Sequence, residues 1–290
     1  EYLANKDLYK SLKNFFILGL IIVNATSILE QATYQLNEKT LVAKIGGDLR
    51  IEMTLNKPTL NMSEISYLYD LILDLGGEKI TFLSSIYLNN ATINDTIIKD
   101  VLIVGYYGNL EYILNHLDSS LVIEENKYGC LLSYNISSFL NLTPKRSSHV
   151  ILKSLGKEYY LPIWGTLYST IGYDYSLNNF IYIPFKVYIK MFNYSPSLRI
   201  LIKLREDADL TKFISNLHNS TSELAKKIEF ETKKDYERYI NSPFSLGLTL
   251  TNLSRAFLVI TIILLITLSL IHISEPTRPR LISYAVFCLK

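Results

Sequence analysis

Residues Thr40–Met53, with the sequence TLVAKIGGDLRIEM, decide how the rest of the chain is interpreted. The stretch is rich in aliphatic residues and is divided in the middle by Gly46-Gly47. Paired glycines within an apolar run are typical of a bulge or a tight turn, because glycine tolerates backbone conformations that other residues avoid. The pattern predicts a strand over residues 40–53 that is broken at the two glycines.

Downstream, helical and strand-like patterns alternate. Ser63–Leu75 shows apolar spacing typical of a helix and ends at Gly76-Gly77, and Asp209 is expected to cap a helix beginning at Leu210. Short helices are also predicted at residues 110–117 and 136–140. Runs rich in Ile, Val, Leu and Tyr predict strands at residues 79–88, 100–107, 121–124, 149–155, 158–168, 180–188 and 197–205. The expected fold class is α+β, a mixed α/β layer with a β-rich insertion.

Composition limits the function. The chain has 290 residues, 49% of them hydrophobic, and a formal net charge of only +2, so it lacks the basic surface of a nucleic-acid-binding protein. Its two cysteines, Cys130 and Cys288, form neither a disulfide framework nor a metal-ligand cluster.

Two apolar segments predict membrane helices. Leu12–Leu29 approaches the roughly 20 residues that a span needs, and Lys6, Lys10 and Lys13 precede it. Positive flanks favour the cytoplasmic side, so the region between the two segments is expected outside the cell. The second segment begins near Arg255 and contains FLVITIILLITL. A buried helix of a soluble protein is the alternative for the first segment.

The last 23 residues, LSLIHISEPTRPRLISYAVFCLK (268–290), do not continue this second segment as a membrane helix should. Charges and two prolines, Pro276 and Pro279, interrupt the apolar pattern. The stretch resembles the translated end of a sequencing-library adapter. We therefore expect residues 268–290 to be an artefact and the second membrane helix to be cut near Thr267.

Glycosylation sequons support an outer location. Nine Asn-x-Ser/Thr sequons are present, where roughly three would arise by chance from the composition. Asn24 lies in the first apolar segment, and Pro144 follows the sequon of Asn141. An accident of an Asn-rich composition is the alternative explanation. The remaining predicted acceptors are Asn61, Asn90, Asn94, Asn135, Asn193, Asn219 and Asn252.

Catalytic motifs are missing from the sequence. His116, His149 and His218 have no partner at metal-ligand spacing, and there is no phosphate-binding glycine loop or nucleophile elbow. Residues 206–209 (EDAD) are interpreted as charges at a strand end followed by a helix cap, with a hard-cation site as the alternative. We expect a non-enzymatic protein with no cofactor and no metal.

Several stretches, taken in order, resemble the FtsX/MacB-like permeases of ABC transporters. They are the lead-in at residues 4–13, GGDLRI (46–51), VLIVG (101–105), LPIWG (161–165), FIYIP (180–184) and residues 198–209. The resemblance implies a membrane helix, a MacB-like periplasmic core domain and a second membrane helix. It also implies a separate ATP-binding subunit, a second permease copy and the lipid membrane as partners, with no nucleic acid.

The domain organisation expected from these patterns has seven parts. They are a cytoplasmic lead-in (1–11), a first membrane helix (12–29), an α/β subdomain in two parts (30–120 and 197–254, the second including a stalk), a β-rich insertion (121–196), the start of a second membrane helix (255–267) and the artefact (268–290). A membrane-anchored receptor or sensor and a glycosylated surface adhesion protein are the alternative functions.

Overall fold

The computed structural model describes residues 2–58, 60–117, 129–142, 149–154, 156–173, 178–195 and 197–240, and some of residues 252–267. The chain divides into two compact units. One comprises residues 1–37 with 238–290, and the other comprises residues 38–237. The strand predicted at residues 121–124 and the expected artefact at 268–290 lie outside the described residues.

The first helix is much longer than the predicted membrane segment. Helix α1 runs from Tyr2 to Ile45, 44 residues, which corresponds to about 66 Å of helix. The prediction of strand for residues 40–45 is therefore wrong. A short aliphatic run is compatible with either a helix or a strand, and here the helix continues up to Gly46-Gly47. Among the described residues, no helix is long and apolar enough to cross a membrane.

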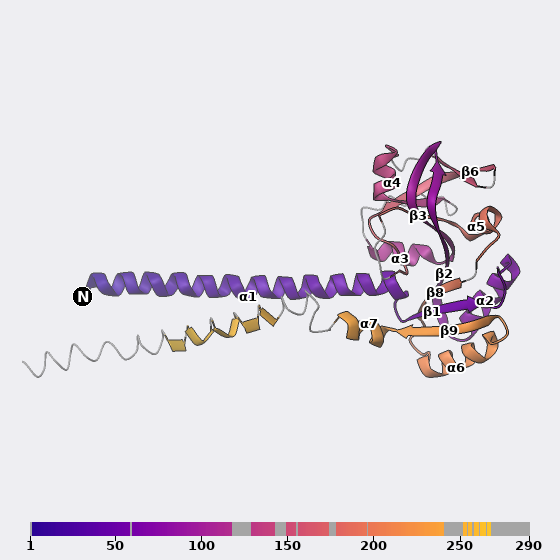
Figure 1. The fold of residues 1–290 in the computed structure, drawn as a ribbon. Helices are drawn as coiled ribbons and strands as arrows, with labels where there is room; N and C mark the ends of the chain where they lie inside the picture. The colour runs from indigo at the N-terminus through magenta and orange to yellow at the C-terminus, as the bar shows by residue number, and fades with distance from the viewer. Residues whose placement is uncertain are drawn as a thin grey trace, which may run out of the picture. The chain divides into compact units, whose positions relative to one another are not determined.

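Four antiparallel strands at one end of a nine-stranded sheet form one half of the second unit (Figure 1), and we call them the four-stranded sheet. Its order is β2 (Gly77–Ile93), β8 (Ser197–Leu204), β1 (Leu49–Leu55) and β9 (Ala225–Thr232). Helix α2 (Met62–Asp74) connects β1 to β2, and helix α6 (Leu210–Thr221) connects β8 to β9. This order and connectivity form a split β-α-β arrangement of the ferredoxin-like type, with a long insertion between β2 and β8.

Side-chain caps fix where the two helices begin. Asn61 caps α2, so the helix begins one residue before the predicted start at Ser63: the Asn61 side chain accepts from Glu64 N, and the Glu64 carboxylate accepts from Asn61 N. Hydrogen bonds from Lys57 and from the Asn61 backbone lower the pKa of Glu64. Asp209 caps α6 as predicted, by accepting from the N–H groups of Thr211 and Lys212.

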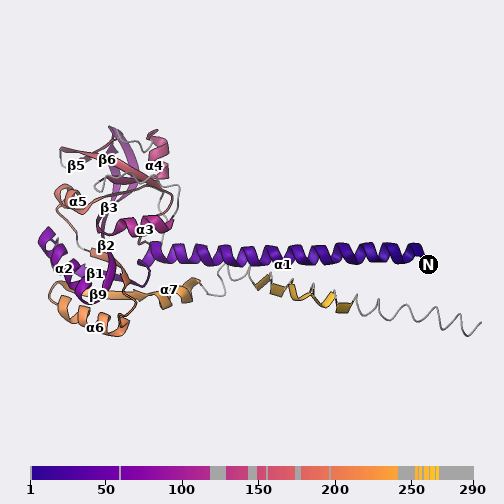
Figure 2. The ribbon, with the colours of Figure 1, turned by 180° about the vertical axis from the view of Figure 1, so that it is seen from behind.

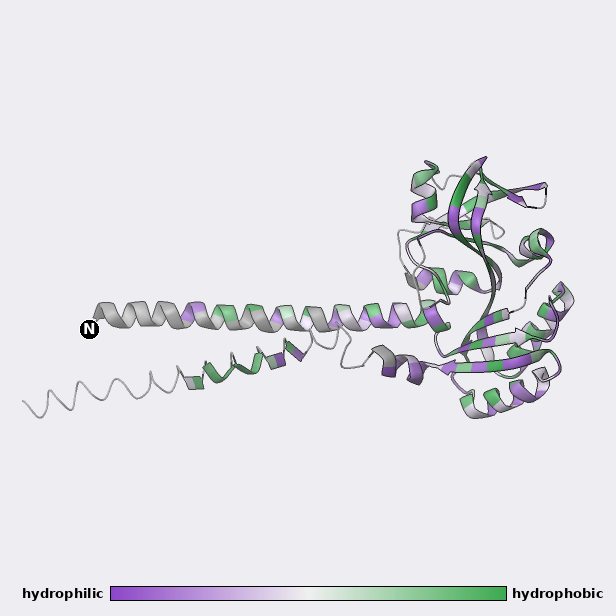
Figure 3. Ribbon diagram, viewed as in Figure 1, coloured by the Kyte–Doolittle hydropathy of each residue, from purple (hydrophilic) through white to green (hydrophobic). Residues whose placement is uncertain are grey.

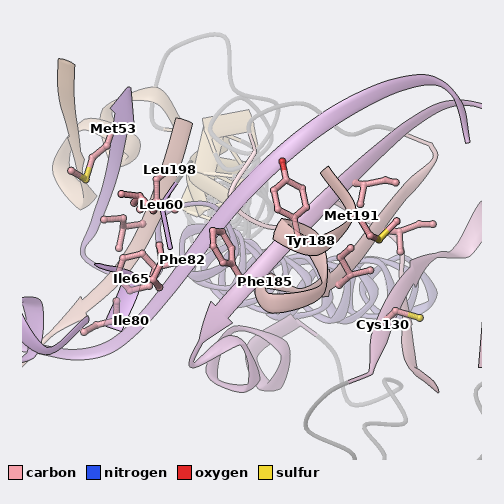
Figure 4. Packing of buried hydrophobic residues seen from close by; sticks show 14 of the residues in the cluster. Met53, Leu60, Ile65, Ile80, Phe82, Cys130, Phe185, Tyr188, Met191 and Leu198 are labelled. Atoms are coloured by element: carbon pink, nitrogen blue, oxygen red, sulfur yellow. The ribbon is translucent and has the colours of Figure 1, made fainter. Parts of the chain in front are cut away.

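The core of this half follows from strand alternation. To the first apolar cluster, β1 contributes Leu49, Ile51, Met53 and Leu55, and β8 contributes Leu198, Ile200, Ile202 and Leu204. They form one cluster with the apolar stripes of α2 and α6. Figure 4 shows Ile65, Ile80, Phe82 and Leu198 gathered in this cluster. The helices therefore cover one face of the sheet, and the alternate side chains of β1 and β8 point to the other face.

The rest of the unit is a ring of strands built on the β2–β3 hairpin. Strand β3 (Thr96–Gly108) pairs with β2 and with β7 (Phe180–Pro184), and the order continues through β4 (Cys130–Ser133), β6 (Lys157–Leu167) and β5 (His149–Ser154). Strand β5 pairs back onto β2 at Thr92 and Ile93, which closes the ring. Figure 2 shows β5, β6 and α4 (Tyr134–Phe139) at the opposite end of the unit from α6 and β9.

One predicted strand is shorter than expected. The structure ends β7 at Pro184 and begins helix α5 (Phe185–Phe192) at the next residue, so the strand predicted to reach Tyr188 is wrong there. Proline lacks the N–H that would continue a ladder. Phe185, Tyr188 and Met191 then follow at helical spacing and are buried.

A second apolar cluster lies apart from the first. It joins Val42 and Ala43 of α1, helix α3 (Leu110–Leu117) and the ring strands, and it includes Trp164 and Leu201. The described part of the chain is thus an α+β fold with a large mixed sheet, as the sequence predicted.

Replacing Asp209 tests how much the cap of α6 contributes to the stability of this half. We expect Asp209→Ala to lower the free energy of unfolding by about 1 kcal/mol, because two N–H groups lose their acceptor. Urea unfolding followed by circular dichroism measures the change. Asp207→Ala, at an exposed position two residues earlier, is the control and should change stability by only a few tenths of a kcal/mol. Equal effects of the two variants would contradict the capping role.

Candidate functional site: the junction of the two chain connections

The chain enters and leaves the second unit at neighbouring positions of one sheet. Leu49, the first residue of β1, lies opposite Thr232, the last residue of β9. The N–H of Lys233 donates to the Asp48 carbonyl at 2.9 Å, just beyond that pair. The segment that arrives from α1 and the segment that leaves toward α7 (Lys233–Ile240) are therefore hydrogen-bonded to each other.

Asp48 also joins this junction to the neighbouring strand β8 by hydrogen bonds. Its N–H donates to Ile202 O at 3.1 Å, and its carboxylate accepts from Leu204 N at 2.9 Å. The backbone and side chain of one residue thus satisfy two groups of β8. Because a buried N–H without an acceptor is destabilising, this carboxylate stabilises the end of β8.

The turn before Asp48 requires glycine. Gly46 has φ of +83°, and a Cβ there would lie 2.5 Å from Ile202 N. Any side chain at this position would combine an unfavourable backbone conformation with a clash against backbone atoms. The chain can therefore turn from α1 into β1 against β8 only because this residue has no Cβ.

The last turn of α1 is packed into the unit. Leu41, Val42, Ala43 and Ile45 are each at most 5% exposed. Burial of these apolar side chains holds the end of α1 in place, at roughly 1.5 kcal/mol or more for each large side chain. The helix is therefore fixed to the unit by its own core residues as well as by the covalent connection.

The segment by which the chain leaves the second unit, from β9 into α7, is also structured. Thr232 N donates to Asp235 Oδ2 at 3.1 Å, and Asp235 N donates to Thr232 Oγ1 at 3.4 Å. This reciprocal pair caps the first turn of α7. Tyr236 is only 7% exposed and anchors the helix. Strand β9 thus passes directly into α7.

Charged side chains lie on the sheet face opposite α2 and α6. Arg50 is 7% exposed and forms an ion pair with Glu231 of β9, and its Nε lies 3.8 Å from Glu52 Oε1. Glu52 also forms an ion pair with Arg199 of β8. A buried arginine requires such partners, so these pairs link β9, β1 and β8 across the sheet. A surface hollow lies over them, lined by Arg50, Glu52, Glu229, Phe230 and Glu231.

The predicted glycosylation sites are scattered over the described surface. Asn61, Asn90, Asn135, Asn193, Asn219 and Asn252 are exposed, while Asn94 is half-buried. Several have structural roles: Asn61 caps α2, Asn193 ends α5 in the left-handed conformation, and Asn94 Oδ1 accepts from Ile151 N at 2.7 Å. None of this tests glycosylation, which stays a prediction.

The other residues considered in the sequence do not converge. His149 and His218 are exposed, and the side chain of His116 lies outside the description. Within the described ranges no group of three or more His, Cys, Asp or Glu residues could hold a metal ion. Cys130 is buried in the ring, and burial raises the pKa of its thiol to about 12. This thiol is therefore protonated at neutral pH and poorly nucleophilic.

Sequence reasoning noted the glycines and Asp48 but missed the ion pairs. The available signal was the strand LRIEMTL, in which Arg50 and Glu52 alternate with Leu49, Ile51 and Met53. That alternation predicts a charged face on a buried strand. The partners Arg199 and Glu231 lie about 150 to 180 residues further along the chain, so only strand register reveals them.

Comparison with known proteins gives structural neighbours only. No family model matches the chain, and no curated protein matches it. Among solved structures, it is similar to the periplasmic region of MacB from Actinobacillus actinomycetemcomitans, with 12% identity, a TM-score of 0.47, and coverage of 70% of this chain and 97% of that one.

Two further solved structures have lower TM-scores. The first is a domain described as part of a permease protein from Porphyromonas gingivalis, with 9% identity, a TM-score of 0.40, and 64% of this chain and 88% of that one covered. The second is the extracellular domain of the noncanonic ABC-type transporter YknZ from Gram-positive bacteria, with 13% identity, a TM-score of 0.36, and 63% and 98% covered. These neighbours are of the kind that the sequence resemblance named. At such identities and scores, they carry no argument about activity.

The carboxylate of Asp48 provides a test of the junction. We expect Asp48→Ala to lower the free energy of unfolding by about 1–2 kcal/mol, because Leu204 N loses its acceptor. Asp48→Asn retains an acceptor oxygen and should recover at least half of the loss. Both are measured by urea unfolding, and an alanine variant as stable as the wild type would show that this hydrogen bond contributes nothing.

Asn61 allows the cap and the predicted glycan to be separated. We expect Asn61→Asp to remove the glycan while keeping stability within a few tenths of a kcal/mol, because Asp caps helices as well as Asn does. Asn61→Ala should remove both and cost about 1 kcal/mol. Intact mass after expression in a glycosylating host reports the glycan, and thermal unfolding reports the cap. Masses of wild type and Asn61→Asp that differ only by the change of side chain would show that Asn61 is not modified.

Proposed function

We propose that this chain belongs to the permease subunit of an FtsX/MacB-like ABC transporter. Its second unit is then the outer domain, and its role is mechanical. Closure of a separate ATP-binding subunit in the cytoplasm would move α1 and the segment after α7, and the outer domain would follow. The chain itself performs no chemistry. The work done is either export of a substrate or transmission of force.

The observation that carries this proposal is the junction. Both connections leave the outer unit at adjacent residues of β1 and β9, and Asp48 bonds them to each other and to β8. Movement of either connection therefore acts on one corner of a hydrogen-bonded sheet. Packed elements of this kind transmit small displacements, because they shift as units and do not deform continuously.

Exposed apolar side chains support the membrane part of the proposal. Ile17, Leu18, Ile21 and Ile28 of α1 are between 46% and 68% exposed. In the second segment, Val259, Ile260 and Ile263 are more than half exposed, and Figure 3 colours the described residues around them as hydrophobic. Many exposed large apolar residues on a helix indicate contact with lipid or with another protein.

The organisation and partners proposed here are those that the sequence predicted. Residues 12–29 and 255–267 belong to membrane helices, residues 1–11 lie in the cytoplasm, and the glycan acceptors lie outside the cell. The partners are an ABC-type ATP-binding subunit, a second permease copy and the lipid membrane. A receptor or an adhesion protein would share the two membrane helices but would need no ATPase.

Cysteine accessibility in whole cells tests the arrangement. We expect Asp207→Cys, at an exposed position after β8, to react with a membrane-impermeant maleimide in intact cells. Lys6→Cys should react only after permeabilisation. Cys130 provides a low background because it is buried and protonated. Reaction of both positions, or of neither, in intact cells would contradict the proposed topology.

A second measurement separates the permease from its rivals. The full-length protein is purified with the ATPase encoded beside its gene, and spin labels on Asp207→Cys report the distance between the two permease copies. Addition of ATP should shift this distance by several ångströms. A receptor or an adhesion protein would show neither a copurifying ATPase nor an ATP-dependent shift.

A further inference from the structure

A four-residue segment after β6 contacts three distant elements of the outer unit. It comprises Thr170, Ile171, Gly172 and Tyr173, each of which is at most 4% exposed apart from Gly172, which is also buried. We call it the bridging segment. It belongs to the ring half of the fold, since it lies between β6 and β7.

The bridging segment caps the end of α1. The last carbonyl groups of a helix have no partner within the helix. Here Gly172 N donates to Ala43 O at 2.7 Å, while Gly46 N donates to Val42 O. The Lys44 ammonium donates to Thr170 O at 3.3 Å and also contacts Tyr173 O. Residues about 130 positions away in sequence thus complete the helix terminus.

The opposite side of the same segment is bonded to the four-stranded sheet. Gly172 O accepts from Arg199 Nη1 at 2.6 Å. The Arg199 guanidinium carbon lies 4.2 Å from the centre of the Tyr173 ring, within the range of a cation–π contact. Arg199 also forms the ion pair with Glu52 described above. Gly172 is therefore held by α1 through its N–H and by β8 through its carbonyl.

A third set of bonds ties the segment to the ring. The hydroxyl of Tyr182 on β7 donates to Ile171 O at 2.8 Å and accepts from Ile171 N at 2.7 Å. Tyr182 is fully buried. A single side chain thus satisfies both backbone groups of Ile171, which fixes the segment relative to β7.

The position of Gly172 strongly favours glycine. Its φ is +75°, and a Cβ would lie 2.6 Å from Leu83 Cδ1 and 3.2 Å from Leu201 Cδ1. A side chain would have to push these two core residues apart. The close approach of α1, β8 and the segment therefore depends on glycine.

We propose that the bridging segment is the element that makes the ring follow α1, with Gly172 as its positioning residue. The proposal rests on the mechanical function proposed above. The covalent connection at Gly46-Gly47 leads only into β1, while the apolar packing of Val42 and Ala43 and the shared strand β2 already join the helix and the sheet to the ring without hydrogen bonds from α1. The bridging segment adds bonds from α1 to β7 and β8, so that the ring and the sheet move with the helix as one body.

Distance measurements on the 290-residue chain in nanodiscs test the link directly. Spin labels are placed at Glu38→Cys on α1 and Lys186→Cys on α5, both exposed positions, in a Cys288→Ser background. We expect a narrow distance distribution in the wild-type sequence and one at least twice as wide in Gly172→Ala. Gly156→Ala is the matched control, because Gly156 has a φ of +73° but no atom within 4 Å of a built Cβ.

A wide distribution in Gly172→Ala and a narrow one in Gly156→Ala support the proposal. Equal widths in the two variants overturn it. Should Gly172→Ala fail to fold, Arg199→Lys replaces it, since lysine keeps the charge near Glu52 but loses the guanidinium bond to Gly172 O. The same at least twofold widening is expected, and an unchanged width overturns the proposal.

A second arm separates this proposal from the proposed function. In the complex with the ATPase, labels at Asp207→Cys report the sheet half and labels at Lys186→Cys report the ring half. In the wild type, ATP should shift both distances. In Gly172→Ala the sheet distance should still shift while the ring shift falls at least twofold. A wild-type complex in which neither distance shifts refutes the mechanical function, whereas equal shifts in wild type and Gly172→Ala refute only the role of the bridging segment.

Discussion

The requirement that the end of α1 find partners for its backbone carbonyls governs much of this fold. A helix that stops inside a protein must have its last carbonyl groups satisfied by something nearby. Here the partners are Gly46, which turns the chain away from the helix axis, and Gly172, which arrives from the ring half. Both are glycines with positive φ and close neighbours. The two halves of the second unit are therefore organised around one helix terminus.

The two apolar clusters are separate, and only the second includes side chains from the end of α1. The first fills the space between the four-stranded sheet and the helices α2 and α6. The second lies among α1, α3 and the ring strands. The β2–β3 hairpin contributes side chains to both, with Phe82 in the first cluster and Leu83 in the second. Because neighbouring residues of a strand point to opposite faces, one hairpin can serve two cores and so join them.

Charged residues complete the connection where apolar packing ends. Arg199 contacts Gly172, Tyr173 and Glu52, and Arg50 pairs with Glu231. Half-buried ion pairs add little net stability, because desolvation offsets most of their attraction. They do fix geometry, since a buried guanidinium left without its partners would be strongly unfavourable. In a domain proposed to transmit movement, defined geometry at the junction matters more than additional stability.

The sequence alone determined the fold class and many of the elements, including every helix and strand of the sheet half except β9. These features could be predicted because apolar periodicity, glycines that end helices and the Asp209 cap are local signals. Each can be recognised within one element. Local pattern was insufficient where an aliphatic run suited both helix and strand, as at residues 40–45 and 185–188. Only the tertiary structure decided the closure of the ring at Ile93, the pairing of Leu49 with Thr232 and the bond from Gly172 to Ala43. These contacts join residues about 60 to 180 positions apart, and they depend on strand register and on the absence of a Cβ at single positions, which no local pattern records.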